Sequence, residues 1–171
     1  ALHNTSYPDA LKKDLANLEM RRLNHAHLYD IPLQPENGLT LDEITPGLQA
    51  EATSLKQNEA YRRMIGMLGE KYLGEGDTLL HGDYYPGSWV RTASGPRVID
   101  PEFAFFGPAE YDVGVCIAHL LMAGYATDTI QRLMSSYQRP TSFDAKLAHQ
   151  FAGMEIMRRL IGVAQLPLTR S

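Results

Sequence analysis

Apolar residues recur at near-helical intervals through the first 75 residues of the chain. Four leucines between residues 11 and 23 share one face and predict a helix over about residues 8–26. A second helix is predicted over residues 60–72, with Gly74 at its C-terminal end. Residues 30–50 between them are rich in Pro and Gly, which predicts an irregular connection with a short helix near Asp42.

The pattern changes to short apolar runs between residues 78 and 100. Three such runs, Thr78–Leu80, Trp89–Arg91 and Arg97–Ile99, are separated by turns that contain Gly and Pro. The second and third runs flank residues 92–96, whose length and composition are typical of a β-hairpin loop. We therefore expect a small cluster of strands here.

Helical spacing returns after Glu110. Tyr111–Gly124 is apolar on nearly all sides, which predicts a central, buried helix. Two further helices are predicted over Asp128–Tyr137 and Ser142–Leu166, the last ended by Pro167. The order of helices, strands and helices predicts one mostly α-helical α+β domain over residues 1–171.

Composition narrows the class of protein. With 44% apolar and 21% charged residues the chain can bury one substantial core. A net charge of −4 argues against a nucleic-acid partner, which would require clustered Lys and Arg. The apolar run Val113–Ala126 is too short to span a membrane, so no membrane partner is expected. The single cysteine, Cys116, and the absence of a signal-peptide pattern favour a cytoplasmic location.

The first candidate for chemistry is the loop 81–89, which joins two predicted strands. It contains His81-Gly82-Asp83 and is rich in Gly and Pro. Loops held between strands commonly present catalytic side chains. Asp83 is therefore a candidate catalytic residue, although an aspartate that caps a turn through backbone hydrogen bonds is the ordinary alternative.

The second candidate is the loop 98–103, which contains Asp100-Pro101-Glu102. In an extended backbone alternate side chains share a face, so Asp100 and Glu102 are expected to approach one cation together. Two carboxylates with open positions for water and phosphate oxygens suit a Mg²⁺ ion bound with a nucleotide. A solvent-facing glutamate is the alternative for Glu102.

The two loops together have the order that phosphoryl transfer requires. Protein kinases use an Asp that accepts the proton of the hydroxyl, a metal ligand five residues later, and a second Asp after a hairpin. Here Asp83 is followed by Ser88 and then, after the predicted hairpin, by Asp100. This spacing indicates a kinase and is a stronger signal than either short motif alone.

The chain resembles the C-terminal lobe of the aminoglycoside phosphotransferase and choline kinase superfamily, and within it the methylthioribose kinases most. The resemblance rests on Gly87-Ser88, on 100–103, on Phe106-Gly107-Pro108 and on 111–114. It extends to Arg158-Arg159, which is similar to an arginine pair directed at the substrate in methylthioribose kinases.

The resemblance implies an enzyme that transfers the γ-phosphate of ATP to a hydroxyl of a small molecule, with Mg²⁺ as cofactor. It implies Asp83 as the catalytic base and Asp100 and Glu102 as ligands of the metal and nucleotide, assisted by Ser88. Arg158 and Arg159 would contact the substrate. His81 and Asp112 would support the site structurally.

Ser88 departs from most of the superfamily, which has Asn there; serine is shorter and lacks the amide carbonyl. No Gly-rich loop followed by a strand Lys is present, so the N-terminal nucleotide-binding lobe is expected to be missing from these residues and to be a further partner of the site.

Several alternatives stay open. A pseudokinase-like binding module, which keeps the fold without catalysis, is the second interpretation of Ser88 and of the missing lobe.

The two arginines lie in a predicted helix, where solvated arginines are common and adjacent side chains point about 100° apart. The negative net charge suits a cationic acceptor, whereas the arginine pair suits an anionic or polyhydroxyl one. A homo-oligomer is compatible with the sequence.

Overall fold

A computed structural model describes residues 2–166 of the chain. The first predicted helix is broken in two, α1 (Asp9–Asp14) and α2 (Leu18–His25), because Asn17 takes a left-handed backbone conformation with φ 46°. Asn17 donates from its side chain to the carbonyls of Glu102 and Ala104, which fixes this bend beside a later loop. Short 3-10 turns lie at Leu2–Asn4 and Ile31–Leu33, and a π-helical turn, Ala26–Asp30, continues α2.

The connection that was predicted to be irregular holds more helix than expected. The short helix near Asp42 is confirmed as α3 (Leu41–Ile44), but α4 (Leu48–Gln57) was not predicted. Helix α5 (Glu59–Leu73) follows, with Asn58 capping its start by accepting a hydrogen bond from the Tyr61 N–H. Gly74 ends it, in an extended conformation rather than a left-handed one.

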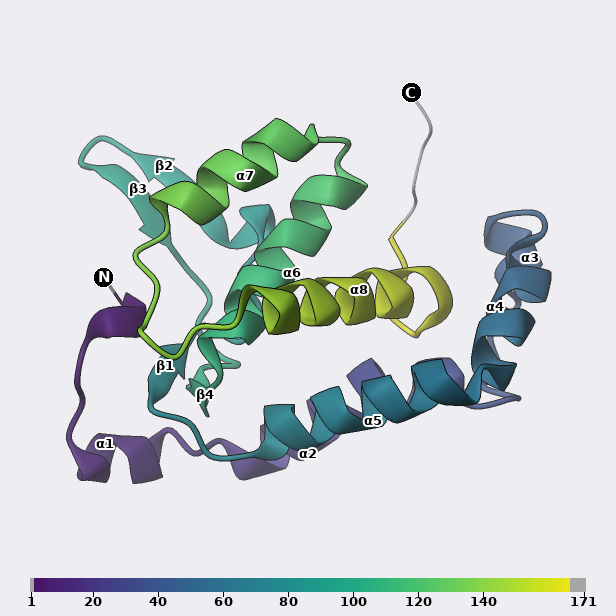
Figure 1. The fold of residues 1–171 in the computed structure, drawn as a ribbon, viewed down its shortest axis with the longest axis horizontal. Coiled ribbons are helices and arrows are strands. Elements are labelled where there is room, and N and C mark those ends of the chain that lie inside the picture. The colour runs from purple at the N-terminus through teal and green to yellow at the C-terminus, as the bar shows by residue number, and fades with distance from the viewer. Residues whose placement is uncertain (1, 167–171) are drawn as a thin grey trace.

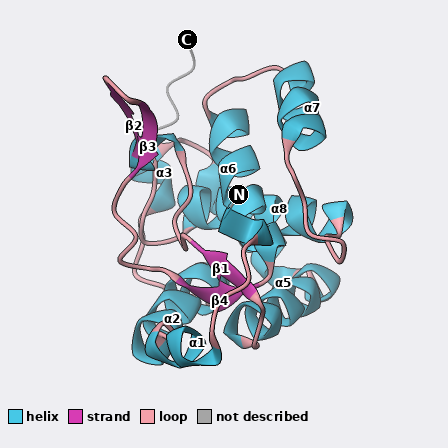
Figure 2. Ribbon diagram, turned by 90° about the vertical axis from the view of Figure 1, so that its left-hand side faces the viewer, coloured by secondary structure: helices cyan, strands magenta, loops and turns pink. Residues whose placement is uncertain are grey.

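Four short strands form two separate antiparallel pairs. Strands β2 (Trp89–Thr92) and β3 (Gly95–Val98) make the expected hairpin, which projects from one side of the molecule (Figure 1). Strand β1 (Thr78–Leu80) pairs with β4 (Phe105–Gly107), which was not predicted (Figure 2). This second pair brings the start of the loop 81–89 and the end of the loop 98–103 to one place.

The C-terminal half is helical: α6 (Ala109–Met122), α7 (Thr127–Ser136) and α8 (Ala145–Ile161). Helix α6 is buried along almost its whole length, as its apolar sequence predicts. The last helix ends at Ile161 with Gly162 as its C-cap, five residues before the predicted end, and the predicted terminator Pro167 lies outside the described residues.

Helices α6 and α8 cross in close contact at Gly114. A Cβ built there would lie 2.6 Å from the Cβ of Phe151 and 2.7 Å from the carbonyl oxygen of Ala148, so only glycine permits this approach. Both residues are on α8, which places its inner face against the start of α6. Figure 1 shows α8 above α5, with α6 rising behind it.

The aromatic residues Tyr72, Phe105 and Tyr111 fill the core between α5, β4 and α6, with ring centroids 4.9–6.1 Å apart. The mostly helical α+β fold class is confirmed. Within residues 2–166, none of the helices is long and apolar enough to cross a membrane.

Candidate active site

The loop 81–88, between β1 and β2, is held from behind by a buried carboxylate. Asp112, in the first turn of α6, accepts hydrogen bonds from the backbone N–H groups of His81 at 2.7 Å and Gly82 at 3.0 Å. The Nε2 of His3 also lies 3.2 Å from the Oδ2 of Asp112. Because Asp112 is 1% exposed, these donors replace water around its charge. The contacts fit the supporting role that the resemblance implied.

His81 joins the two candidate loops through both ring nitrogens. Its Nε2 lies 2.8 Å from the carbonyl oxygen of Ile99, and its Nδ1 lies 3.3 Å from the backbone N–H of Asp83. A carbonyl only accepts and an N–H only donates, so these contacts require the neutral tautomer with its proton on Nε2. In that tautomer His81 braces the loops and has no nitrogen left for metal.

Gly82 brings the two loops together without a side chain between them. Its φ is +85°, a left-handed conformation, and a Cβ at this position would overlap the carbonyl group of Phe103. The backbone next to Asp83 therefore lies directly against the loop 98–103.

Ser88 is buried and turned inward. Its hydroxyl donates to the carbonyl oxygen of Asp83 at 3.1 Å, and its own carbonyl accepts from the N–H of Ile99 at 2.9 Å. The hydroxyl proton thus closes the loop 83–88 on itself. The oxygen of Ser88 keeps lone pairs that a metal or a metal-bound water can use.

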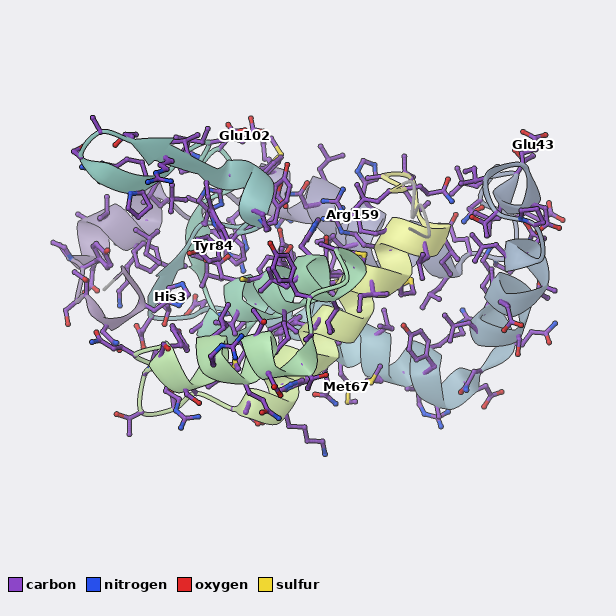
Figure 3. All side chains as sticks on the ribbon, turned by 90° about the horizontal axis from the view of Figure 1, so that it is seen from above. His3, Glu43, Met67, Tyr84, Glu102 and Arg159 are labelled. Carbon is purple, nitrogen blue, oxygen red and sulfur yellow. The ribbon has the colours of Figure 1, made fainter. Side chains whose placement is uncertain are left out.

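Asp100 and Glu102 both lie at the surface, but not on an extended strand. Asp100 has φ +65°, and the carbonyl of Pro101 accepts from the N–H of Ala104 at 2.9 Å, which makes a tight turn. The extended backbone that was predicted between the two carboxylates is therefore absent, and their joint approach to one cation stays a prediction. Figure 3 shows Glu102 at the margin of the molecule, beside the hairpin.

The metal assignment itself stays a prediction. Asp100 and Glu102 supply the hard oxygen donors that Mg²⁺ prefers. Over residues 2–166 no group of three or more His, Cys, Asp and Glu side chains is already gathered around one point. These two residues would need phosphate or water oxygens to complete a metal site, which is the usual coordination of nucleotide-bound Mg²⁺.

Asp83 lines a cavity of about 220 Å³. The cavity is lined by the end of α2, by the following π-helical turn, by the loop 98–103 and by the C-terminal end of α8. Asn24 and His27 belong to the first two segments, and neither was predicted as a site residue. Isolated π-helical turns are frequent at functional sites.

Burial raises the pKa of the Asp83 carboxyl, and the charge of Glu155 acts in the same direction. Arg158 and Arg159 oppose the rise, with a terminal nitrogen of Arg159 at 3.9 Å from the carboxylate. The side chain of Asp83 is 27% exposed, so a ligand in the cavity can reach it. A partly buried carboxylate with a raised pKa is suited to accept a proton from a ligand group within hydrogen-bond reach.

The arginine pair is not a solvated one. Arg158 and Arg159 are each 13% exposed in their side chains and both line the cavity. Both donate through Nε to Glu155, which is fully buried, at 2.6 Å and 2.9 Å. The two side chains leave the helix axis in different directions, as expected, but residues three and four positions after Glu155 both lie close enough to reach back to it, so the two arginines share this partner. Figure 3 shows Arg159 near the middle of the molecule.

Glu155 was missed in the sequence, although Glu-x-x-Arg-Arg at spacing i, i+3 and i+4 is a signal that could have found it. Burial by itself would raise the pKa of Glu155, but Arg158, His119 and Arg159 together lower it to about 2. The Nε2 of His119 on α6 lies 3.0 Å from the same carboxylate. The charged cluster thus links α6, α8 and the cavity.

Comparison with known proteins gives these features a context. A family model described as the phosphotransferase enzyme family matches residues 4–151. A methylthioribose kinase of Exiguobacterium sibiricum is 44% identical over 82 residues, which cover 48% of this chain and 21% of that protein.

Two further relatives align over longer segments. Methylthioribose kinase 1 of Oryza sativa subsp. japonica is 33% identical over 114 residues, 66% of this chain and 26% of that protein. A methylthioribose kinase of Geobacillus kaustophilus is 30% identical over 157 residues, 73% and 39% of the two chains. The chain spans well under half the length of these relatives.

Proposed function

Because the chain belongs to the phosphotransferase enzyme family, we propose that it carries the acceptor side of an ATP-dependent small-molecule kinase. One observation carries the proposal: Asp83 and the pair Arg158 and Arg159 meet in a single cavity, next to the loop that holds Asp100 and Glu102. The names of the relatives make methylthioribose the first acceptor to test.

The proposed reaction joins the acceptor oxygen to the γ-phosphorus of ATP and breaks the bond from that phosphorus to the β,γ-bridging oxygen. ADP leaves with the bond electrons, and the hydroxyl proton passes to the Asp83 carboxylate. A carboxylate whose pKa is raised accepts this proton more readily than an exposed one. Arg158 and Arg159 orient the oxygen-rich acceptor in the cavity.

Asp100 and Glu102 are the residues that would hold Mg²⁺, with Ser88 contributing through its oxygen or through water. When bound, the ion would neutralise the β- and γ-phosphates of the nucleotide. We place the nucleotide-covering lobe outside these 171 residues. The greater length of the relatives supports this placement.

The test is turnover of ATP with the intact protein and a panel of acceptors, namely methylthioribose, other sugars, choline and an aminoglycoside. Asp83→Ala should lower kcat by about three orders of magnitude or more, because proton acceptance and acceptor orientation are both lost. Binding of Mg²⁺–ATP should change less than twofold. A matched control is Asp144→Asn, at the exposed start of α8, where the amide oxygen can still accept from Lys146. Unchanged turnover in Asp83→Ala would refute the mechanism.

A non-catalytic binding module is the second candidate, favoured by the inward-turned hydroxyl of Ser88. It predicts no Mg²⁺-dependent ATP consumption with any acceptor. Detectable phosphate transfer that Asp83→Ala abolishes rules it out.

A further inference from the structure

Glu155 is the most deeply buried charged side chain near the cavity, and each of its oxygens has a donor. Oε2 accepts from the Nε of Arg158 at 2.6 Å. Oε1 accepts from the Nε of Arg159 at 2.9 Å and lies 3.0 Å from the Nε2 of His119. A carboxylate with no proton can only accept, so Nε2 of His119 carries the hydrogen. The three donors fix Glu155 from two helices.

The contacts use one nitrogen of each guanidinium and leave the terminal nitrogens for other partners. One terminal nitrogen of Arg159 lies 3.9 Å from Asp83, and another lies 3.4 Å from the carbonyl oxygen of Ala164. For Arg158, Glu155 is the hydrogen-bond partner found over residues 2–166. Since both arginines line the cavity, their terminal N–H groups are available to oxygen atoms of a ligand.

Glu155 also sets the charge of the site. Without it, two guanidinium groups would lie side by side against the single negative charge of Asp83. With it, the Asp, Glu and Arg groups of the cluster sum to zero. A neutral site favours an uncharged polyhydroxyl ligand over an anionic one, because no excess positive charge draws the anion in.

We propose that Glu155, held by His119, is a positioning residue that presents Arg158 and Arg159 as a two-pronged, charge-balanced site selecting an uncharged polyhydroxyl acceptor. This inference rests on the proposed function and goes beyond it by naming what aligns the arginines and which acceptor class they accept. The lowered pKa of Glu155 agrees with it, since the carboxylate stays ionised in the working pH range.

The central experiment is Glu155→Gln in the intact protein, assayed with methylthioribose as acceptor and inorganic phosphate as competing anion. The amide would place an N–H donor against one arginine Nε–H and remove one negative charge. The KM for methylthioribose should rise about tenfold or more, while the KM for ATP stays within about twofold. Inhibition by inorganic phosphate should become several-fold stronger, because the site gains a net positive charge.

The opposite movement of the two ligands separates positioning from general damage. A disrupted fold would weaken acceptor and phosphate alike, and an irrelevant residue would move neither, so both outcomes overturn the proposal. Glu110→Gln is the matched control, because Glu110 is another buried glutamate, accepts a hydrogen bond from the Asp144 N–H at 2.7 Å and lies outside the cavity. It should leave both constants unchanged.

His119 gives a second, milder test in case Glu155→Gln does not fold. His119→Gln keeps an N–H donor near the position of Nε2 and should retain the KM for methylthioribose within about twofold. His119→Phe keeps the ring shape but removes the donor and should raise that KM severalfold. Equal constants for the two variants would contradict the role of the His119–Glu155 contact.

A readout that does not depend on turnover separates this proposal from the proposed function. In NMR spectra of the intact protein, the Nε–H protons of Arg158 and Arg159 should exchange slowly with water, and Glu155→Gln should remove that protection. If the wild type transfers no phosphate to any acceptor, the proposed function fails. If the two Nε–H protons exchange freely in the wild type, the positioning proposal fails whatever the turnover.

Discussion

Asp112→Asn tests whether one buried carboxylate sets the position of the catalytic loop. Asp112 accepts the backbone N–H groups of His81 and Gly82 on different oxygens, with His3 as a third donor. Asparagine has the same shape but one acceptor oxygen, and its NH₂ group would face a backbone N–H. One of the two loop hydrogen bonds must therefore break, and a donor is left buried without a partner.

The size of the effect follows from these contacts. Hydrogen bonds to a charged group contribute about 1.5–3 kcal/mol, and a buried unsatisfied donor costs about 1–3 kcal/mol. We expect a loss of about 2–4 kcal/mol in the free energy of unfolding. A typical domain has a free energy of unfolding of about 5–15 kcal/mol, so the variant should still fold. The loop should move by a fraction of an ångström to about 1 Å, which lowers kcat/KM roughly 100-fold.

Urea unfolding and steady-state kinetics on the intact protein measure the two quantities. The slope of the unfolding transition should stay constant, so that the midpoint reports stability. Asp144→Asn is the control, since an amide serves an exposed helix start as well as a carboxylate does. A loss under about 0.5 kcal/mol together with normal turnover would refute the reasoning.

Two further predictions concern the same loop. Arg158→Met removes a cation that lowers the pKa of Asp83 and leaves Glu155, which raises it, so the acidic limb of the kcat/KM profile should move to higher pH. Arg158→Lys keeps the charge and should leave the limb in place; a limb that stays in both variants contradicts Asp83 as the base. Gly82→Ala should lower stability by about 2 kcal/mol or more and reduce kcat, because its Cβ meets Phe103 in a left-handed conformation. A urea midpoint like that of the wild type would show that the loops are not in contact there.

The sequence predicts best where local chemistry decides the structure. Residues 111–124 are apolar on nearly all sides, which predicts a buried helix, and α6 is buried from Ala109 to Leu120. Turn residues between Trp89 and Val98 predict the hairpin, and β2 and β3 form it. In both cases the decisive pattern lies within one short segment of the chain, so no long-range contact is needed to recognise it.

Long-range contacts explain what the sequence did not predict. Strand β4 has three residues and no alternating pattern, and it is a strand because Phe105 and Gly107 pair with Leu80 and Thr78. The break at Asn17 depends on carbonyls more than 80 positions away. Asp100 takes a left-handed conformation, which aspartate tolerates but which its presence in the sequence does not predict. None of these is encoded by periodicity.

The arginine pair shows how a local rule can mislead when only two residues are compared. Arg158 and Arg159 do point in different directions from the axis of α8, and that fact alone argued against a joint role. Glu155 changes the outcome, because positions i+3 and i+4 lie on either side of position i one turn away, and long side chains reach back to it. The carboxylate makes one site from two diverging side chains. Its burial, which comes from the packing of α6 against α8, is what turns an ordinary surface ion-pair pattern into a rigid one.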